Sequence, residues 1–442
     1  MTRPQTLAWW GLVLLIASAT GAAAQTVRAL PFRLSALVAE PVSGRLYGAL
    51  PPTEGAAANS VVAIDPVAGT AGVPVFVGSD PRVLAPSSDG QFLWVGLGGA
   101  SAIRRVDVGA GTAGPLFPLV RVSVFDQPEF AQVILPVPGS PGTIVVGQGP
   151  RNSGGMESFV VYDQGVARPS RVQAYGDSIV AVDATTLLVT TSTEFLRLRL
   201  DPSGLTVAER RQVFPSPARF LSAAGGLVHA EAGAVYDATT LEVVRVLRTP
   251  RIYNGRYLAV PEHGRFYHLV DGTLVTRDLE TYDQLSTRGL PTALGAPSTP
   301  VVLGGGLAYF TSLPSVVLFG DFAAPPPVPL PHPMPSARVE LSGCTTCRAG
   351  DPFIASVTFT NPSPAAVRAE VKGRILNGRI NIPLFGAPHG TIDVGPGTQT
   401  VTVLQGTVPA TGVAGSWFME IALVDPVSGR TYSTSYRSFF IY

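Results

Sequence analysis

The sequence has few charged side chains, and neither sign is in excess. Only 14% of its 442 residues are charged, and 31 basic residues against 30 acidic residues give a formal net charge of +1. Lys372 is the single lysine. Proteins that bind nucleic acid carry clustered positive charge, so this composition argues against a nucleic-acid partner and against an acidic interaction tail.

Long apolar runs are also lacking, except near the N-terminus. Arg3 precedes an apolar run at residues 7–19, and three alanines at residues 22–24 precede Gln25. This order is typical of a secretory signal peptide. The run is short for a membrane span of ~20 residues. We therefore expect residues 1–24 to be a signal peptide and the mature chain to be exported, to the periplasm or outside a bacterial cell, without a membrane span. An uncleaved anchor is the alternative.

Signals for helices are scarce, whereas turn residues are abundant. The chain contains 48 glycines and 41 prolines, yet 46% of its residues are hydrophobic. Many short apolar runs separated by glycine and proline are typical of an all-β protein with a packed core.

Seven related units follow one another along most of the chain. Each has a middle apolar run just after a turn, and these runs begin at Gly44, Gly90, Gly142, Thr185, Gly225, Gly264 and Gly305. The spacing of 39 to 52 residues brackets the period of about 40–45 residues for four-stranded propeller blades. Small aliphatic residues dominate the run before each of these, as expected for strands that crowd around a central axis.

The run that follows the middle one ends on an acidic residue before a turn. These residues are Asp65, Asp107, Asp163, Asp201, Asp237, Asp278 and Asp321. The seventh unit lacks a fourth run, and an unassigned run at residues 26–32 precedes the first unit. We expect this N-terminal run to supply the missing outer strand of the last blade, because such closure removes an exposed sheet edge. The sequence therefore predicts a seven-bladed β-propeller over residues 25–322.

The second unit has the most distinctive pattern. DPRVLAPSSDGQFLWVG, followed by VDV and a glycine-rich turn, resembles the YVTN-type bacterial propeller repeat. That broad group includes surface-layer proteins, binding modules and some lactonase-like enzymes, so the resemblance implies a fold rather than one function. Trp94 in this unit is expected to pack between blades.

The composition changes after the propeller region. Residues 323–337 hold seven prolines and are predicted to form an extended linker. Residues 338–442 contain about seven runs that alternate apolar and polar side chains, which predicts a β-sandwich. TFTNPSPAAV and GSWFMEIALVDPVSGRTYS resemble bacterial immunoglobulin-like or fibronectin-like domains, with Trp417 expected in the core.

Cysteine is limited to Cys344 and Cys347. In an exported chain such a pair is most simply a disulfide. A redox-active pair would need a helix N-terminus, and a zinc site would need two further ligands nearby, and the sequence indicates neither. We expect a structural disulfide between the first two strands of the sandwich, and neither a metal nor a cofactor.

Polar residues gather in the loops before the innermost strands, the face where propellers usually meet ligands. The candidate ligand-binding residues are Asp80, Arg82, Asp126, Glu129, Tyr175, Asp177, Arg219, Tyr253, Asn254 and Arg256. They mix carboxylates, guanidiniums and aromatic rings around one predicted channel mouth. Ordinary solvated loop residues and ion pairs between blades are the other interpretation of this set.

The sequence favours an exported, non-enzymatic binding or scaffold protein. Its propeller would present a ligand-binding or protein-binding face, and its sandwich would dock to a partner protein or to a glycan of the cell envelope. The alternative is a propeller-type hydrolase or lactonase with its site at the channel mouth. No nucleophile elbow, phosphate-binding loop or dinucleotide fingerprint appears in the sequence.

Overall fold

The computed structural model describes most of the chain after the N-terminal segment. The described residues are 27–121, 127–150, 155–191, 194–212, 221–224, 226–230, 234–246, 256–270, 272–279, 284–290, 297–313, 315–327, 335–377, 380–383, 390–408, 414–427, 429 and 431–442. Within them the regular structure is β-strand, apart from two short 3-10 turns, η1 (Gly55–Ala57) and η3 (Pro261–His263). No helix in this part of the chain is long and apolar enough to cross a membrane.

Seven antiparallel sheets of four or five strands follow one another in the described chain up to residue 321. Sheet 1 contains β2 (Ala36–Glu40), β3 (Arg45–Leu50), β4 (Ser60–Asp65), β5 (Thr70–Ala71) and β6 (Val75–Phe76). Sheet 2 contains β7 (Pro81–Pro86), β8 (Phe92–Leu97), β9 (Ala102–Asp107) and β10 (Thr112–Pro118). Sheet 3 contains β11 (Glu129–Val137), β12 (Ser140–Pro150), β13 (Met156–Asp163), β14 (Val166–Ala167) and β15 (Val172–Gly176). Sheet 4 contains β16 (Ser178–Ala181), β17 (Thr186–Thr190), β18 (Glu194–Asp201) and β19 (Gly204–Gln212).

The remaining three sheets follow the same order. Sheet 5 contains β20 (Leu221–Ala224), β21 (Leu227–Ala230), β22 (Ala234–Asp237) and β23 (Val243–Val246). Sheet 6 contains β24 (Arg256–Val260), β25 (Arg265–Val270), β26 (Thr273–Asp278) and β27 (Gln284–Gly289). Sheet 7 contains β28 (Val301–Leu303), β29 (Gly305–Phe310), β30 (Val316–Asp321) and, from the other end of the chain, β1 (Val27–Leu30).

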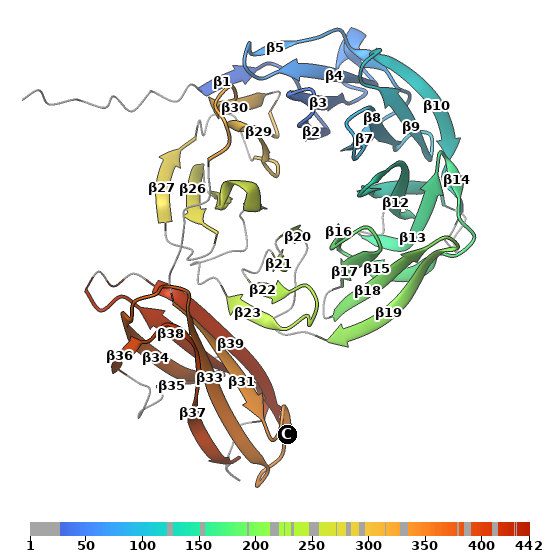
Figure 1. Ribbon diagram of the computed structural model, residues 1–442. Coiled ribbons are helices and arrows are strands. Elements are labelled where there is room, and N and C mark those ends of the chain that lie inside the picture. Colours follow the sequence, from blue (N-terminus) through green and yellow to red (C-terminus); the bar gives the residue numbers. More distant parts are fainter. Residues whose placement is uncertain are drawn as a thin grey trace, which may run out of the picture.

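The seven sheets stand in a ring around a central opening (Figure 1). In each sheet the first strand of the unit lies innermost and the later strands lie progressively outward. β1 pairs with β30, with Val27 opposite Phe319 and Leu30 opposite Val316. The expectation that the N-terminal run completes the last sheet is therefore confirmed.

Apolar packing between neighbouring sheets explains the continuous apolar runs of the sequence. In β8, Leu93, Trp94 and Val95 are all buried, because each face of the sheet meets a neighbouring sheet. The Trp94 ring contacts the Phe117 ring edge-on at 6.0 Å and shares a cluster with Tyr162 of sheet 3. Trp94 thus packs between sheets, as the sequence predicted.

The repeated aspartate has a local structural cause. In all seven sheets the third strand ends on this residue. In five of the seven the carboxylate accepts hydrogen bonds from the backbone of the following turn. Asp65 Oδ1, for example, accepts the N–H groups of Val67 and Ala68 at 2.9 Å each. Such a side chain satisfies donors that the ladder leaves free, so aspartate is favoured at this position.

Two further sheets form a C-terminal sandwich. One contains β31 (Ser336–Ser342), β33 (Pro352–Asn361) and β37 (Gly397–Thr407). The other contains β32 (Thr346–Cys347), β34 (Val367–Asn377), β35 (Ile380–Pro383), β36 (Gly390–Val394), β38 (Gly415–Val424) and β39 (Thr431–Ile441). Side chains of both sheets share one core, which includes Trp417. β31 begins two residues before the predicted start of the sandwich at residue 338.

The sandwich has a disulfide in the chain after β31 and side-chain hydrogen bonds between its two sheets. Cys344 and Cys347 form the expected disulfide, and Cys347 is buried beside β39. The edge of β31 is closed by side chains, because Ser433 Oγ accepts the Ala337 N–H at 2.8 Å. Ser435 Oγ accepts the N–H of Val339 at 2.9 Å in the same way. The serine hydroxyls of β39 therefore replace a neighbouring strand along this edge.

Candidate binding site at the channel mouth and the domain junction

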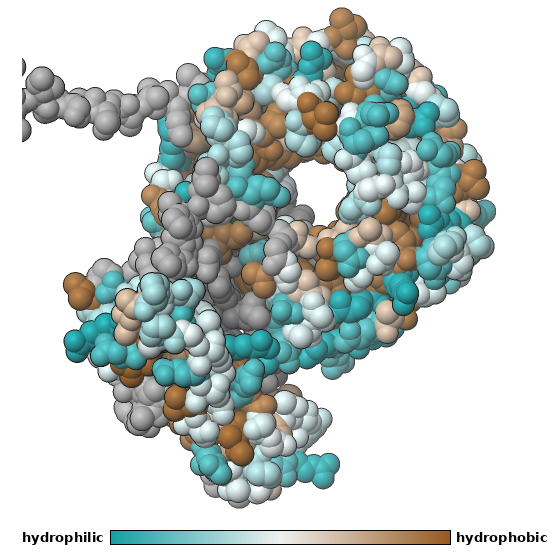
Figure 2. All heavy atoms as spheres, viewed as in Figure 1, coloured by the Kyte–Doolittle hydropathy of each residue, from teal (hydrophilic) through white to brown (hydrophobic). Residues whose placement is uncertain are grey.

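The candidate site surrounds the central opening of the ring. Figure 2 shows that this opening is not filled by the described residues on the face in view. The innermost strands border it, and their side chains are largely small and aliphatic, as in β2 and β16. Polar side chains at the opening must therefore belong to the ends of these strands and to the segments that lead into them.

Asp80 and Arg82 form an ion pair where the chain enters β7. Arg82 Nε donates to Asp80 Oδ2 at 2.7 Å. The Asp80 side chain is 12% exposed, whereas that of Arg82 is 52% exposed. The carboxylate thus anchors one edge of the guanidinium, and the remaining N–H groups of Arg82 face solvent as donors.

The backbone of Asp80 is held in an uncommon conformation. Its φ angle is +56°, which aspartate tolerates better than most residues. The Asp80 N–H donates to Asn59 Oδ1 at 2.9 Å, and its carbonyl accepts the Gly98 N–H at 2.7 Å. Contacts on both sides therefore fix the ion pair at the mouth.

Gly98 and Gly99 explain the glycine-rich VGLGGAS segment. A Cβ on Gly98 would lie 2.9 Å from Asp80 Oδ2 and 3.0 Å from Arg82 Cδ. A Cβ on Gly99 would lie 2.1 Å from Ser79 Oγ. The glycines allow this turn between β8 and β9 to pack directly on the ion pair.

Glu129 lies in a different environment from Arg82. It begins β11 and is only 3% exposed, so it stands behind the mouth rather than on its solvent-facing rim. Burial and, to a smaller extent, the negative charge of Glu129 raise the pKa of Tyr162 to about 12.

Sequence reasoning missed a buried network beside Glu129. Tyr162 Oη accepts the Val120 N–H at 2.9 Å and donates to Gln148 Oε1 at 3.2 Å. Gln148 Nε2 donates to the Val120 carbonyl at 2.6 Å, which closes the network. It secures the segment that precedes β11, and the only sequence signal was a glutamine and a tyrosine among apolar residues.

The other predicted residues fall in three groups. Tyr175, 48% exposed, and Asp177 lie where β15 passes to β16, and the Asp177 N–H donates to the Thr190 carbonyl at 2.7 Å. Arg256 begins β24, but its side chain lies outside the described atoms. Outside the described residues altogether are Asp126, Arg219, Tyr253 and Asn254.

The described mouth is suited to holding a polar group by charge and hydrogen bonds. Its clearest element is a half-exposed guanidinium on a carboxylate anchor, which can contact an anionic or acceptor-rich group. Among the described residues, no group of three His, Cys, Asp or Glu side chains is placed to hold a metal ion. The buried His229 and His268 are packed within sheets 5 and 6.

Comparisons with known proteins find similarity to solved structures and none to family models or curated sequences. No protein-family model matches the sequence, and no curated protein matches it. Among solved structures, hydrazine synthase of Kuenenia stuttgartiensis is 14% identical, with a TM-score of 0.50 over 66% of this chain and 96% of that chain. The Cps50 (Swd1) β-propeller domain of Myceliophteria thermophila is 11% identical, with a TM-score of 0.49 over 67% of this chain and 99% of that chain.

The ring consists of antiparallel sheets arranged radially, each with its first strand innermost, and this arrangement defines its architecture. The ring is a β-propeller. At identities this low, the similarity extends to the fold alone.

The sandwich packs directly on sheet 5 of the propeller. β39 runs beside β23, and Tyr436 of β39 is buried in a propeller cluster that includes Tyr236 and Leu241. The Arg437 guanidinium pairs with the Glu242 carboxylate beside this cluster. Apolar burial and an ion pair therefore fix the sandwich to one edge of the propeller.

The turn from β22 to β23 differs from its counterparts in sheets 1 and 2. In sheets 1 and 2 the fourth residue after the aspartate is glycine, with φ of +69° at Gly69 and +61° at Gly111. In sheet 5 the same position is Leu241, with φ of +55°, and it is buried. The left-handed conformation costs an L-residue roughly 1–2 kcal/mol. Packing of the Leu241 side chain at the sandwich junction offsets that cost.

Two arginines of sheet 4 hold the same turn. Arg197 donates to the carbonyls of Ala238 at 3.0 Å and Thr239 at 2.6 Å. Arg211 Nη1 donates to the Thr240 carbonyl, and Arg211 Nη2 lies 3.7 Å from Glu242 Oε1. The junction is thus fixed from the propeller side as well as from the sandwich side.

Proposed function

We propose that the chain is an exported, non-enzymatic binding or scaffold protein. It combines a seven-bladed propeller of the YVTN type with an immunoglobulin-like or fibronectin-like sandwich. Seven sheets between residues 27 and 321 and the pairing of β1 with β30 support the blade number. The common core of the two C-terminal sheets around Trp417 supports the sandwich class. The apolar run before Gln25 supports export.

The Asp80–Arg82 pair carries the proposal for the propeller face. A guanidinium that is half exposed and anchored at one edge is pre-organised to bind a polar partner, so less side-chain entropy is lost on binding. The partner is a protein or an envelope glycan with acceptor groups. The sandwich, fixed on sheet 5, adds a second surface at a set orientation.

A binding comparison tests this proposal. The full chain, the Arg82→Gln variant and the Arg368→Gln variant are each immobilised and exposed to the protein and polysaccharide fractions of a bacterial envelope. Arg368 is an exposed arginine of the sandwich and serves as the matched control.

We expect one fraction to bind the native chain and the Arg368→Gln variant, and to bind Arg82→Gln at least about 5-fold more weakly, the loss of a charge-assisted contact. Equal binding to all three chains would contradict the proposed role of the mouth. Turnover of a lactone or ester by the native chain would contradict the non-enzymatic function.

A further inference from the structure

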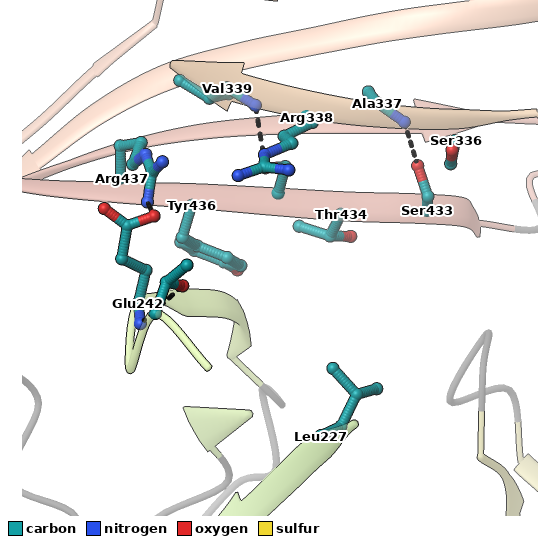
Figure 3. Close-up of a pocket in the computed structure, with 12 residues that line it drawn as sticks. Leu227, Glu242, Ser336, Ala337, Arg338, Val339, Ser433, Thr434, Tyr436 and Arg437 are labelled. Carbon is teal, nitrogen blue, oxygen red and sulfur yellow. Dashed lines mark hydrogen bonds and ion pairs between the residues drawn. The ribbon is translucent and has the colours of Figure 1, made fainter. Parts of the chain in front are cut away.

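A cavity lies where the sandwich meets the propeller. Its volume is about 180 Å³, and Leu227, Thr240 and Glu242 line it from the propeller (Figure 3). From the sandwich it is lined by β31 and β39. The cavity exists only because both domains contribute a wall.

The sandwich wall offers buried hydrogen-bond donors. Ser433 and Ser435 line the cavity, and each is only 5% exposed. Both hydroxyls accept a backbone N–H of β31, so each still carries a proton that it can donate. No acceptor among the described residues receives these two protons, and a buried donor without an acceptor is costly. A ligand with acceptor oxygens would satisfy them.

The charges around the cavity favour a negative ligand. The lining contains Arg338, Arg437 and Glu242. Glu242 is engaged by Arg437 and by Arg211 of β19, which leaves Arg338 as the cation with weak pairing. The pair between Arg338 and Glu340 is long, at 3.5 Å, and both side chains are more than half exposed. Exposed pairs of this kind are worth about 0–1 kcal/mol.

One more carboxylate acts on Arg338. The charge of Asp237 interacts with that of Arg338. Asp237 Oδ1, however, accepts the N–H groups of Thr239 at 2.9 Å and Thr240 at 2.7 Å, which commits this oxygen to its own turn. Among the residues that line the cavity, two arginines stand against one glutamate, so its wall carries one net positive charge.

We propose that this junction cavity binds a small oxyanion, a carboxylate or a sulfate group, between Arg338 and the hydroxyls of Ser433 and Ser435. Either group has several oxygen lone pairs, so it can accept hydrogen bonds from the guanidinium and from both hydroxyls at once. A volume of about 180 Å³ holds a single charged group or one acidic sugar, since a water molecule takes about 30 Å³. The site is separate from the channel mouth, so the two proposals fail independently.

Titration of the full chain tests the site. Sodium sulfate, sodium acetate and sodium glucuronate are added at constant ionic strength, and binding is followed by calorimetry and by the rise in Tm. We expect saturable binding of at least one of them with a Kd of about 1 mM or tighter. Glucuronate binding more tightly than acetate identifies an acidic sugar as the source, whereas equal binding identifies a free anion.

Arg338→Gln is the decisive variant, and Arg368→Gln is its control on the same domain. We expect Arg338→Gln to weaken binding about 10-fold or more and Arg368→Gln to leave it unchanged. Both substitutions keep the side chain long and lie on exposed positions, so both variants should fold. Sulfate also stabilises folded proteins in general, because it is excluded from their surfaces. If it stabilises the native chain and both variants equally, the proposal is overturned. The absence of saturable binding overturns it as well.

Discussion

Leu241 of the propeller and Tyr436 of the sandwich belong to one buried cluster, with 1% and 5% of their surfaces exposed. They are 195 positions apart in the chain. The two domains therefore share a hydrophobic core at the junction, and their stabilities should be coupled.

A double-mutant cycle measures this coupling. Leu241→Ala and Tyr436→Ala should each lower the free energy of unfolding by about 2–4 kcal/mol, because each leaves a cavity in the shared cluster. The double variant should lose less than the sum, by about 0.5 kcal/mol or more. Urea unfolding followed by tryptophan fluorescence gives these values. Additive losses would mean that the two side chains act independently. The control is Leu285→Ala, at a partly exposed leucine of β27.

The backbone of Leu241 gives a second test. Alanine normally stabilises a protein relative to glycine, by roughly 0.5–1 kcal/mol. At φ of +55° the order should reverse, because a Cβ in the left-handed region costs roughly 1–2 kcal/mol. We therefore expect Leu241→Gly to unfold at a higher urea concentration than Leu241→Ala. An alanine variant that is the more stable of the two would show that the turn is not strained.

The close packing of Gly98 on the ion pair predicts a cost for any side chain there. Gly98→Ala places a Cβ within 3.0 Å of both Asp80 Oδ2 and Arg82 Cδ. We expect a loss of about 1–3 kcal/mol and a shift of the Asp80–Arg82 pair. Gly289→Ala is the control, since a Cβ there meets no atom within 4 Å. Thermal unfolding compares the two, and equal Tm values would contradict the packing argument.

Tyr162 predicts the behaviour of the protein in alkali. Burial raises its pKa in the folded state from 10.0 to about 12, so as the pH rises past 10 the unfolded chain loses this proton first. The stabilisation is complete below pH 10 and falls as the pH approaches 12. At 1.36 kcal/mol per pKa unit, Tyr162 contributes roughly 2–3 kcal/mol to this fall.

Tyr162→Phe separates this tyrosine from the others. At pH 8 the variant should be about 1–3 kcal/mol less stable, because the Val120 N–H and Gln148 lose a buried partner. Between pH 10 and 12 its stability should fall less steeply than that of the native chain. Tyr442→Phe, at an exposed tyrosine, is the control, and identical pH profiles for native and Tyr162→Phe chains would contradict the role of the network.

The sheets, strand order and disulfide were predictable because their signals are local and periodic. An aspartate ends the third strand of each unit, and in units 1 and 2 a glycine follows four residues later, as at residues 65–69. The burial of Glu129 was not predictable, since Glu129 lies near Tyr162 of β13, 33 positions further along the chain. The junction was hidden for the same reason. Leu241 stands where units 1 and 2 have glycine, but units 3 and 4 also lack glycine there, at Ala167 and Leu205, so this position did not mark the junction.

The pairing of β1 with β30 links the start of the propeller to its end. Val27 finds its partner, Phe319, only after 292 further residues have been synthesised. Contacts of such sequence separation form slowly, because the entropy of closing the loop is lost before the contact forms. During synthesis, six sheets can form while the first strand waits unpaired. The final step of propeller folding is therefore the pairing of β1 with β30. Under force, the ring should open first between these two strands.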